Sequence, residues 1–181
     1  MNERILSPYC TMSDRWLFPA LLAGAVFVVY GFTRYPIHGG GLDSAEFQIA
    51  GKILGVTHPT GYPLYCLTGR LLASLPLGSL AVRMTLFSTL ALVLALVFLA
   101  VSIRRITDST GTAAVAVLLL AVSPPAWNAA TIAEVYALHA LFVCILILTY
   151  LSHVDEQTTF TARRFAFTLG LALTHHLMAL F

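Results

Sequence analysis

Residues 81–103 read AVRMTLFSTLALVLALVFLAVSI and decide the fold class of this chain. The run carries one charge, at Arg83, and as an α-helix it would rise about 35 Å, which is enough to cross the hydrocarbon core of a bilayer. An apolar run of this length is typical of a transmembrane helix. The chain is therefore predicted to be an all-α polytopic membrane protein, with four further spans near residues 16–35, 110–126, 132–151 and 165–181.

The composition agrees with this fold class. The 181 residues are 59% hydrophobic and 10% charged, and their mean hydropathy of +0.86 exceeds what the core of a soluble protein of this size could bury. The net charge of +2 is spread along the chain, so no basic patch favours nucleic acid as a partner. We expect residues 1–181 to form one transmembrane domain. Because the last run is still apolar at Phe181, we expect the chain to be the N-terminal part of a longer protein.

Basic residues predict the orientation in the membrane, because short cytoplasmic loops retain Lys and Arg. Three basic pairs fall on one side of the predicted spans, which makes that side and the N-terminus cytoplasmic. The loop of residues 36–80 then lies on the outer or lumenal face, and the first span is an uncleaved signal anchor. The pairs are Arg4 and Arg15, Arg104 and Arg105, and Arg163 and Arg164, and the unpaired residues that oppose the rule are Arg34, Lys52, Arg70 and Arg83.

The outer loop is predicted to hold two short helices. Residues 44–54 fit one helix, which Gly55 would end, and residues 63–75 fit a second, which is closed by Pro76. About 13 residues of helix rise only about 20 Å, which is too little to cross the hydrocarbon core. We therefore expect both helices to lie along the membrane surface, above the spans.

Two carboxylates, Asp43 and Glu46, precede and open the first of these short helices. One interpretation is structural, since Asp-x-x-Glu at a helix start is a capping box that satisfies free backbone N–H groups. The other is catalytic. Gly39, Gly40 and Gly41 would let the backbone approach a ligand closely, while a carboxylate acts as general base on an incoming hydroxyl. The spacing alone leaves both interpretations open.

The segment His58-Pro59-Thr60-Gly61-Tyr62-Pro63 joins the two predicted helices. Its prolines fix the backbone and Gly61 permits a turn, so a rigid corner is one explanation. His58 and Tyr62 also supply a titratable ring and a phenol, which suit a contact with sugar or phosphate. The sequence leaves both explanations open.

A second group of polar residues lies at the start of the fourth predicted span. Glu134 is costly to bury without a partner, although a helix-start carboxylate that remains in water is an alternative. His139 lies about 7 Å deeper and shares a helix face with Tyr136. His175 and His176 form a further pair, and because neighbours on a helix point about 100° apart, at most one is expected to face a given partner. Each histidine is also explained by a hydrogen bond to a neighbouring helix.

Several of these residues belong to longer motifs, which follow one another along the chain as Gly40-Gly41-Leu42-Asp43-Ser44-Ala45-Glu46, His58-Pro59-Thr60-Gly61-Tyr62-Pro63-Leu64-Tyr65, Ser123-Pro124-Pro125-Ala126-Trp127, Glu134-Val135-Tyr136-Ala137-Leu138 and Thr174-His175-His176. In this order they resemble the membrane glycosyltransferases related to transmembrane protein 260. The resemblance implies a GT-C architecture with an acidic residue on the first outer loop. It also implies transfer of mannose or another hexose from a polyprenyl-phosphate donor to a protein or glycan acceptor. The membrane would be the plasma membrane of a prokaryote or the endoplasmic reticulum of a eukaryote.

The mechanism that we expect from this resemblance is an inverting transfer in which Asp43, with Glu46 beside it, deprotonates the acceptor hydroxyl. Tyr62 would stack on the sugar, and Lys52 or Arg70 would meet the charge of the departing phosphate. No metal site is assigned, and a divalent cation is left open as a cofactor. The residues expected to contact the donor or the acceptor are His58, Tyr62, Glu134, Tyr136, His139, His175 and His176.

Three alternatives come from other functional classes. A proton-coupled secondary transporter would use Glu134, His139 and His175 as a relay, with polar residues at mid-depth and a broken helix pair. A metal-dependent hydrolase would be supported by a compact His-Glu-x-x-His motif, which the sequence does not contain. A non-catalytic membrane subunit would leave Asp43, His58 and Glu134 scattered, whereas an enzyme requires them to converge.

Overall fold

The computed structural model describes residues 12–34, 42–59 and 61–180. Its elements are α1 (Met12–Thr33), α2 (Leu42–Ile53), α3 (Pro63–Ala73), α4 (Leu80–Thr107), α5 (Thr110–Ala121), α6 (Pro124–Thr131), α7 (Tyr136–Glu156), α8 (Thr159–His175) and the short 3-10 helix η1 (Leu177–Leu180). The secondary structure in the described ranges is entirely helical, which confirms the predicted all-α class. Side chains fix several helix starts, since Ser79, Ser109 and Thr158 each accept a hydrogen bond from a backbone N–H in the first turn of α4, α5 and α8.

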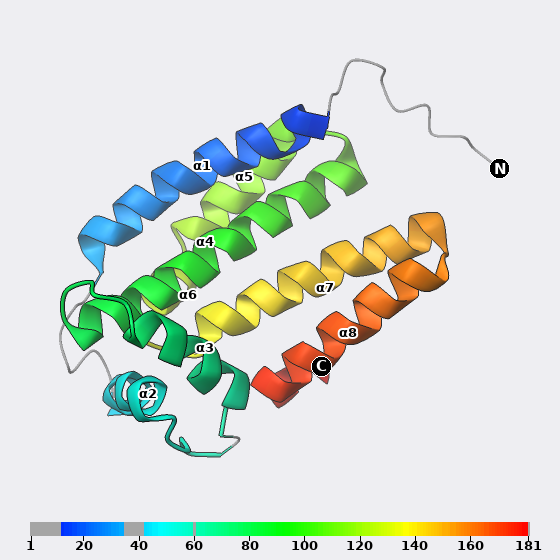
Figure 1. The fold of residues 1–181 in the computed structure, drawn as a ribbon. Coiled ribbons are helices and arrows are strands. Elements are labelled where there is room, and N and C mark those ends of the chain that lie inside the picture. The colour runs from blue at the N-terminus through cyan, green and yellow to red at the C-terminus, as the bar shows by residue number, and fades with distance from the viewer. Residues whose placement is uncertain (1–11, 35–41, 60, 181) are drawn as a thin grey trace.

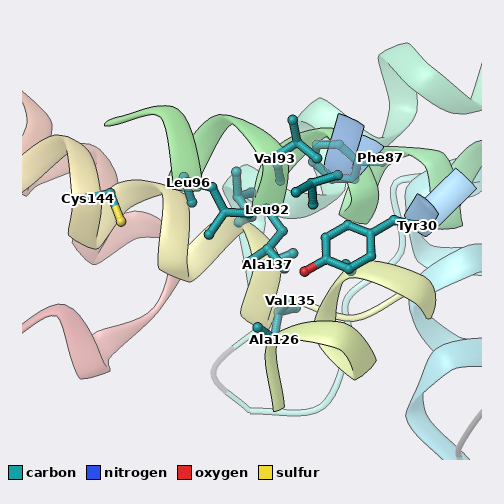
Figure 2. Close-up of a cluster of buried hydrophobic side chains, with 14 of the residues drawn as sticks. Tyr30, Phe87, Leu92, Val93, Leu96, Ala126, Val135, Ala137 and Cys144 are labelled. Carbon is teal, nitrogen blue, oxygen red and sulfur yellow. The ribbon is translucent and has the colours of Figure 1, made fainter. Parts of the chain in front are cut away.

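Helix α4 is the centre of the bundle (Figure 1). α1 and α5 lie on one side of it and α7 and α8 on the other, and α4 contacts α1, α5, α6 and α7. Small residues allow the helices to approach closely, since Ala81, Ala91 and Ala95 of α4 are almost fully buried. Figure 2 shows part of this core, to which Tyr30, Phe87, Leu92, Val93, Leu96, Ala126, Val135, Ala137 and Cys144 belong.

Two helices of the described chain are long and apolar enough to cross a bilayer, α4 with 28 residues and α7 with 21. α5 and α6 would together make a third span, but they are bent by 68°. The expected span at residues 110–126 is therefore wrong as a continuous helix. α5 ends at Ala121 and α6 begins at Pro124, because Pro124 and Pro125 have no N–H with which to continue the helix.

The predicted span at residues 132–151 begins later in the structure, since α7 begins at Tyr136. The segment that precedes α7 stays outside the helix, because the Oγ of Ser88 bonds both the N–H and the C=O of Glu134 at 3.4 Å. α1, Met12–Thr33, covers most of the first predicted span, and its described apolar part is Leu17–Thr33.

The predicted span at residues 165–181 begins earlier and ends earlier than expected. α8 begins at Thr159 because Thr158 and Thr161 form a capping box, and it ends at His175. Where the sequence predicts five spans, the described helices thus include two, or three with the bent pair, that are long and apolar enough to cross a membrane.

The outer loop forms two short helices, as predicted, with boundaries that differ by one or two residues. We call α2, α3 and the segment between them, residues 54–62, the platform. Leu54 ends α2 in the left-handed conformation, with φ of 54°, in place of the glycine that follows it. α2 and α3 approach each other at Gly51 and Gly69, where a Cβ added to Gly51 would lie 2.9 Å from the Cε of Met84. The close fit of the two short helices therefore depends on the absence of side chains there.

The platform lies at one end of the bundle, where α1, α5 and α8 end and where α4 and α7 begin (Figure 1). We call the other end, where α4 and α7 end and α8 begins, the basic end. Arg104 and Arg105 lie there, and Arg105 forms an ion pair with Asp155 at 2.9 Å. Arg163 and Arg164 belong to the first turns of α8 and lie at the same end. These two basic pairs and the platform are therefore at opposite ends of the described bundle.

Some of the predicted features cannot be placed. Arg4 and the glycines Gly39, Gly40 and Gly41 lie outside the described residues, as does the side chain of Arg15.

Candidate functional site

A hydrogen-bonded pair, Glu46 and His58, holds the platform together. Glu46 lies on α2, and His58 lies on the segment between α2 and α3. The backbone N–H of His58 donates to the Oε1 of Glu46 at 2.7 Å, and the Nδ1 of His58 lies 2.8 Å from the Oε2. This side-chain hydrogen bond is the main cause that lowers the pKa of Glu46 and raises the pKa of His58. Both oxygens of Glu46 are thus engaged by His58, and Asp43 lies inside α2, which begins at Leu42, and not at the N-cap position that the predicted capping box requires.

Asp43 lies beside this pair, exposed within the first turn of α2. One oxygen from each of Asp43 and Glu46 and one ring nitrogen of His58 lie within 4.8 Å of one another. This spacing would suit oxygen and nitrogen ligands of a divalent cation, but the hydrogen bond between Glu46 and His58 already uses two of the donor atoms. The geometry therefore fits a group of acid–base side chains better than an ion site.

Glu134 lies close enough to interact electrostatically with Asp43 and His58, from the segment between α6 and α7. Its side chain is buried, with the residue only 9% exposed. Burial, and next the negative charge of Asp43, raise the pKa of Glu134 from its ordinary value of 4.5 to about 7, while His58 and the N–H of Val135 act in the opposite direction. Tyr136 follows at the start of α7 and is 56% exposed, so this end of the bundle also presents an aromatic ring to its surroundings.

A layer of aromatic and imidazole rings connects the platform to α7 and α8. The centroid of the Tyr62 ring lies 5.6 Å from that of His58 and 5.3 Å from that of His176. Phe47 of α2 packs against Tyr62 at 5.5 Å, and His139 of α7 lies 5.0 Å from His176. Tyr62 is buried by these neighbours, and its left-handed φ of 43° is unusual for a bulky residue. Its ring is therefore a wall of the site and not an open surface.

The expectation that His175 and His176 cannot both face one partner is wrong. α8 ends at His175, and His176 is extended, with φ of −150° and ψ of 126°, so the angular offset of a helix no longer separates the two rings. The centroid of the Tyr62 ring lies 6.2 Å from that of His175 and 5.3 Å from that of His176. The Nε2 of His175 also lies 3.1 Å from the carbonyl oxygen of Val135, which ties the end of α8 to the start of α7.

Sequence reasoning missed Tyr65, which is fully buried on α3. Its ring lies 6.4 Å from that of His175 and 5.2 Å from that of Phe87. Among the described residues, the Oη of Tyr65 and the Nδ1 atoms of His139 and His175 are buried without a hydrogen-bond partner. Each such atom costs about 1–3 kcal/mol. The signal that could have found Tyr65 is its place as the last residue of the motif that begins at His58.

The structure does not bring Lys52 and Arg70 to the carboxylates. Lys52 lies in the last turn of α2, about 14 Å along the helix axis from Asp43. The guanidinium of Arg70 donates a hydrogen bond to the carbonyl oxygen of Lys52. The phosphate contact expected of these two residues therefore gains no support from their positions.

The fold and the site together define a class of protein, a helical membrane protein with its carboxylates and imidazoles gathered at one end of the bundle. Residues 43–181 match the family described as the protein O-mannosyl-transferase TMEM260 N-terminal domain, and the chain belongs to this family. The match begins at Asp43 and includes the whole candidate site.

The chain is also similar to two curated relatives whose names match this family. Protein O-mannosyl-transferase TMEM260 of Mus musculus is 34% identical over 139 residues, which are 74% of this chain and 20% of the relative. Protein O-mannosyl-transferase tmem260 of Dictyostelium discoideum is 25% identical over 122 residues, which are 66% of this chain and 15% of the relative. The chain spans a fifth or less of the length of these curated relatives. No solved structure matches it.

Proposed function

We propose that this chain is the N-terminal part of a membrane glycosyltransferase. The enzyme would move a hexose from a polyprenyl-phosphate donor to a hydroxyl group of a protein or glycan, and mannose is the first candidate for the hexose. The family match and the names of the two relatives support this reaction class. In this proposal the fold is of the GT-C type, residues 1–181 form one multi-pass transmembrane domain, and the transfer is inverting.

The observation that carries the proposal is the meeting of Asp43, Glu46 and His58 at the platform end. A non-catalytic subunit would not require these residues to converge. Two of the basic pairs, Arg104 with Arg105 and Arg163 with Arg164, lie at the opposite end, so the positive-inside rule favours a cytoplasmic N-terminus and an outer or lumenal platform. There a donor with its tail in the bilayer and its phosphosugar at the interface would meet the acceptor. The membrane would be the plasma membrane in a prokaryote and the endoplasmic reticulum in a eukaryote.

Asp43 is the proposed general base because its carboxylate is exposed at the start of α2. As the acceptor oxygen forms its bond to the anomeric carbon, the hydroxyl proton moves to Asp43. The bond between the anomeric carbon and the phosphate oxygen breaks at the same time, and its electron pair leaves with the lipid phosphate. Because attack and departure occur on opposite faces of the sugar ring, the anomeric centre is inverted.

Exposure and charge assign roles to the other residues. Tyr136 is open, so we assign stacking on the sugar to Tyr136 and not to the buried Tyr62. Glu134, with its pKa near neutrality, would donate a hydrogen bond to a sugar or acceptor hydroxyl while it is protonated. The residues that would support the site from behind through the ring layer are Tyr62, His139, His175 and His176.

The proposal is tested with the full-length protein in lipid vesicles. Radiolabelled polyprenyl-phosphate mannose and polyprenyl-phosphate glucose are supplied in separate reactions, each with a serine- and threonine-rich peptide and a free glycan as acceptors. We expect label to reach at least one acceptor from one of the two donors. Label that stays on the lipid with both donors, for a protein that is folded by its thermal transition, would contradict the proposal.

One observation favours a second candidate, a proton-coupled transporter. α5 and α6 form a helix pair broken by 68°, and the rings of His139 and His175 lie 6.5 Å apart. Their position near the start of α7 places them toward the end of the bundle and not at mid-depth, which favours the transferase. Vesicles loaded with a pH-sensitive dye separate the two functions, because solute-driven proton uptake without a sugar donor would favour the transporter.

A further inference from the structure

We propose that His58 takes over the proton of the acceptor hydroxyl during transfer and that Glu46 is the positioning residue that makes this possible. This inference rests on the proposed function and assigns a second acid–base group to the same site. It follows from the two hydrogen bonds that join Glu46 to His58 and from the nearness of Asp43.

The contacts with Glu46 fix both the orientation and the tautomer of the His58 ring. The carboxylate of Glu46 accepts a hydrogen bond from the backbone N–H of His58 at 2.7 Å, and it lies 2.8 Å from the Nδ1 of the same residue. The ring therefore cannot turn without losing a hydrogen bond. An ionised carboxylate has no hydrogen to donate, and the proton must therefore lie on Nδ1. The neutral ring then carries its free electron pair on Nε2, which is the atom that can accept a proton.

The charges that surround His58 stabilise the imidazolium once it has formed. Glu46 and Asp43 act from α2 and Glu134 acts from the segment between α6 and α7, and the pKa of His58 is raised chiefly by the bond to Glu46. Tyr62, at the start of α3, adds a buried neutral phenol with a raised pKa. Carboxylates thus act on the ring from two separate parts of the chain, and among the described residues no Lys or Arg contributes to its pKa.

The geometry also provides a route for the proton. An oxygen of Asp43 and a ring nitrogen of His58 lie within 4.8 Å of each other, a distance that one bridging water can cover. The proton passes from the acceptor hydroxyl to Asp43 and from Asp43 to the Nε2 of His58, while the electron pair of the broken bond leaves with the phosphate. Asp43 is thereby ionised again. The side chain of His58 is 39% exposed, so the imidazolium can release its proton to water before the next cycle.

The sharpest variant is Glu46→Gln, because it keeps the size of the side chain and an oxygen that can accept the backbone N–H of His58. The amide NH2 that then faces Nδ1 is a donor, so it favours the tautomer with the hydrogen on Nε2, where the lone pair is needed. A second variant, His58→Ala, removes the ring and leaves space for free imidazole. The matched controls are Glu156→Gln and His153→Gln, which lie at the basic end on α7.

The experiment measures kcat and KM for the full-length protein in vesicles with a polyprenyl-phosphate hexose, between pH 5 and pH 9. We expect kcat to fall about 10²–10³-fold in Glu46→Gln and in His58→Ala, with KM for the donor changed less than about threefold. Imidazole at millimolar concentration should restore part of the rate of His58→Ala. The acid limb of the wild-type profile should move to lower pH in Glu46→Gln, because the group that raises the pKa of His58 is gone. The two controls should behave as wild type.

Three results would overturn the inference. The first is a kcat for both variants within threefold of the controls. The second is a loss of kcat that imidazole does not relieve and that leaves the pH profile unchanged, which would show that His58 only holds the platform in place. The third is a wild-type protein that transfers no sugar, which removes the proposed function together with the inference. In the first two results the wild type remains active, so failure of the inference is distinct from failure of the function.

Discussion

The two ends of the helix bundle contain similar polar residues but use them differently. At the basic end several of the described polar side chains bond to each other across helices. Arg105 pairs with Asp155 and donates to the Oγ of Ser152 at 2.8 Å, and the Nδ1 of His153 lies 3.1 Å from the Oγ1 of Thr161. These bonds join α4 to α7 and α7 to α8.

At the platform end the pairing is incomplete. Glu46 and His58 bond to each other, but Asp43 is exposed beside them and Glu134 is buried with a pKa near neutrality. Stable helix bundles normally satisfy their polar groups, so this excess of reactive side chains costs stability. The comparison teaches that one end holds the helices together, while the other keeps chemical groups available for a ligand.

The largest difference between the two ends is expected in how much a substitution there lowers the rate of sugar transfer. Asp43→Asn removes the proposed base without a change in size, and we expect the transfer rate to fall about 10²–10⁴-fold. Asp108→Asn at the basic end is the matched control, because Asp108 ends α4 in the left-handed conformation that asparagine also tolerates. The measurement is single-turnover transfer from a radiolabelled donor. Equal rates for the two variants would reduce Asp43 to a structural residue of α2.

The second difference concerns the pH dependence of stability. The pKa of Glu134 is about 7 in the folded protein and has an ordinary value of 4.5, so the folded state holds this proton more tightly than the unfolded state. Its contribution favours folding at low pH and is lost as the pH rises from about 4.5 to about 7, by up to about 3 kcal/mol.

Glu134→Gln removes this titration. We expect the variant to have a higher thermal midpoint than wild type at pH 8 and a similar one at pH 4.5, as measured by a thermal shift assay in detergent. A midpoint difference that is the same at both pH values would show that Glu134 is not held in an environment that opposes its charge.

A third test concerns the packing that supports the platform. Gly51→Leu inserts a side chain where even a Cβ would lie 2.9 Å from Met84, and it should separate α2 from α3. We expect a loss of about 1–3 kcal/mol in the free energy of unfolding, together with reduced transfer. Gly170→Leu on α8 is the control, since no atom lies within 4 Å of the position of its Cβ. Equal thermal midpoints for the two variants would mean that the helices of the platform are not in close contact.

The smallest effect is expected at the basic end. Arg105→Gln breaks an ion pair that is partly exposed, and such pairs contribute only about 0.2–1 kcal/mol. We expect a slightly lower thermal midpoint and an unchanged transfer rate. A large loss of transfer in Arg105→Gln, with the fold intact, would remove the functional distinction between the two ends.

The fold class could be predicted because it follows from the hydropathy of the sequence. The platform could be predicted because Gly55 and Pro76 mark the ends of its two short helices. The run at residues 81–103 is apolar throughout and becomes the central helix α4. Breaks that depend on tertiary contacts could not be predicted. The late start of α7 reflects hydrogen bonds between Ser88 and Glu134, which are 46 residues apart. The bend at Pro124 could have been predicted, since the pair of prolines is visible in the sequence.

Part of the group of residues that meets at the platform end was named from the sequence, but its arrangement was not. The motifs named Asp43, Glu46 and His58, yet the sequence could not tell that Glu46 would bond His58 and not the end of its own helix. The sequence also could not tell which tyrosines are buried, because burial is a property of the packed fold. Tyr62 is enclosed by other rings, and Tyr65 is fully buried on α3.

The central claim is that the substrates meet the chain at the platform end, and photo-crosslinking tests it most directly. A benzophenone amino acid replaces Tyr136 at the platform end in one protein and Phe160 at the basic end in another, since both side chains are exposed. Each protein is irradiated with a radiolabelled polyprenyl-phosphate hexose. We predict a crosslink to the sugar at position 136 and none at position 160. Label at position 160 alone would contradict this account.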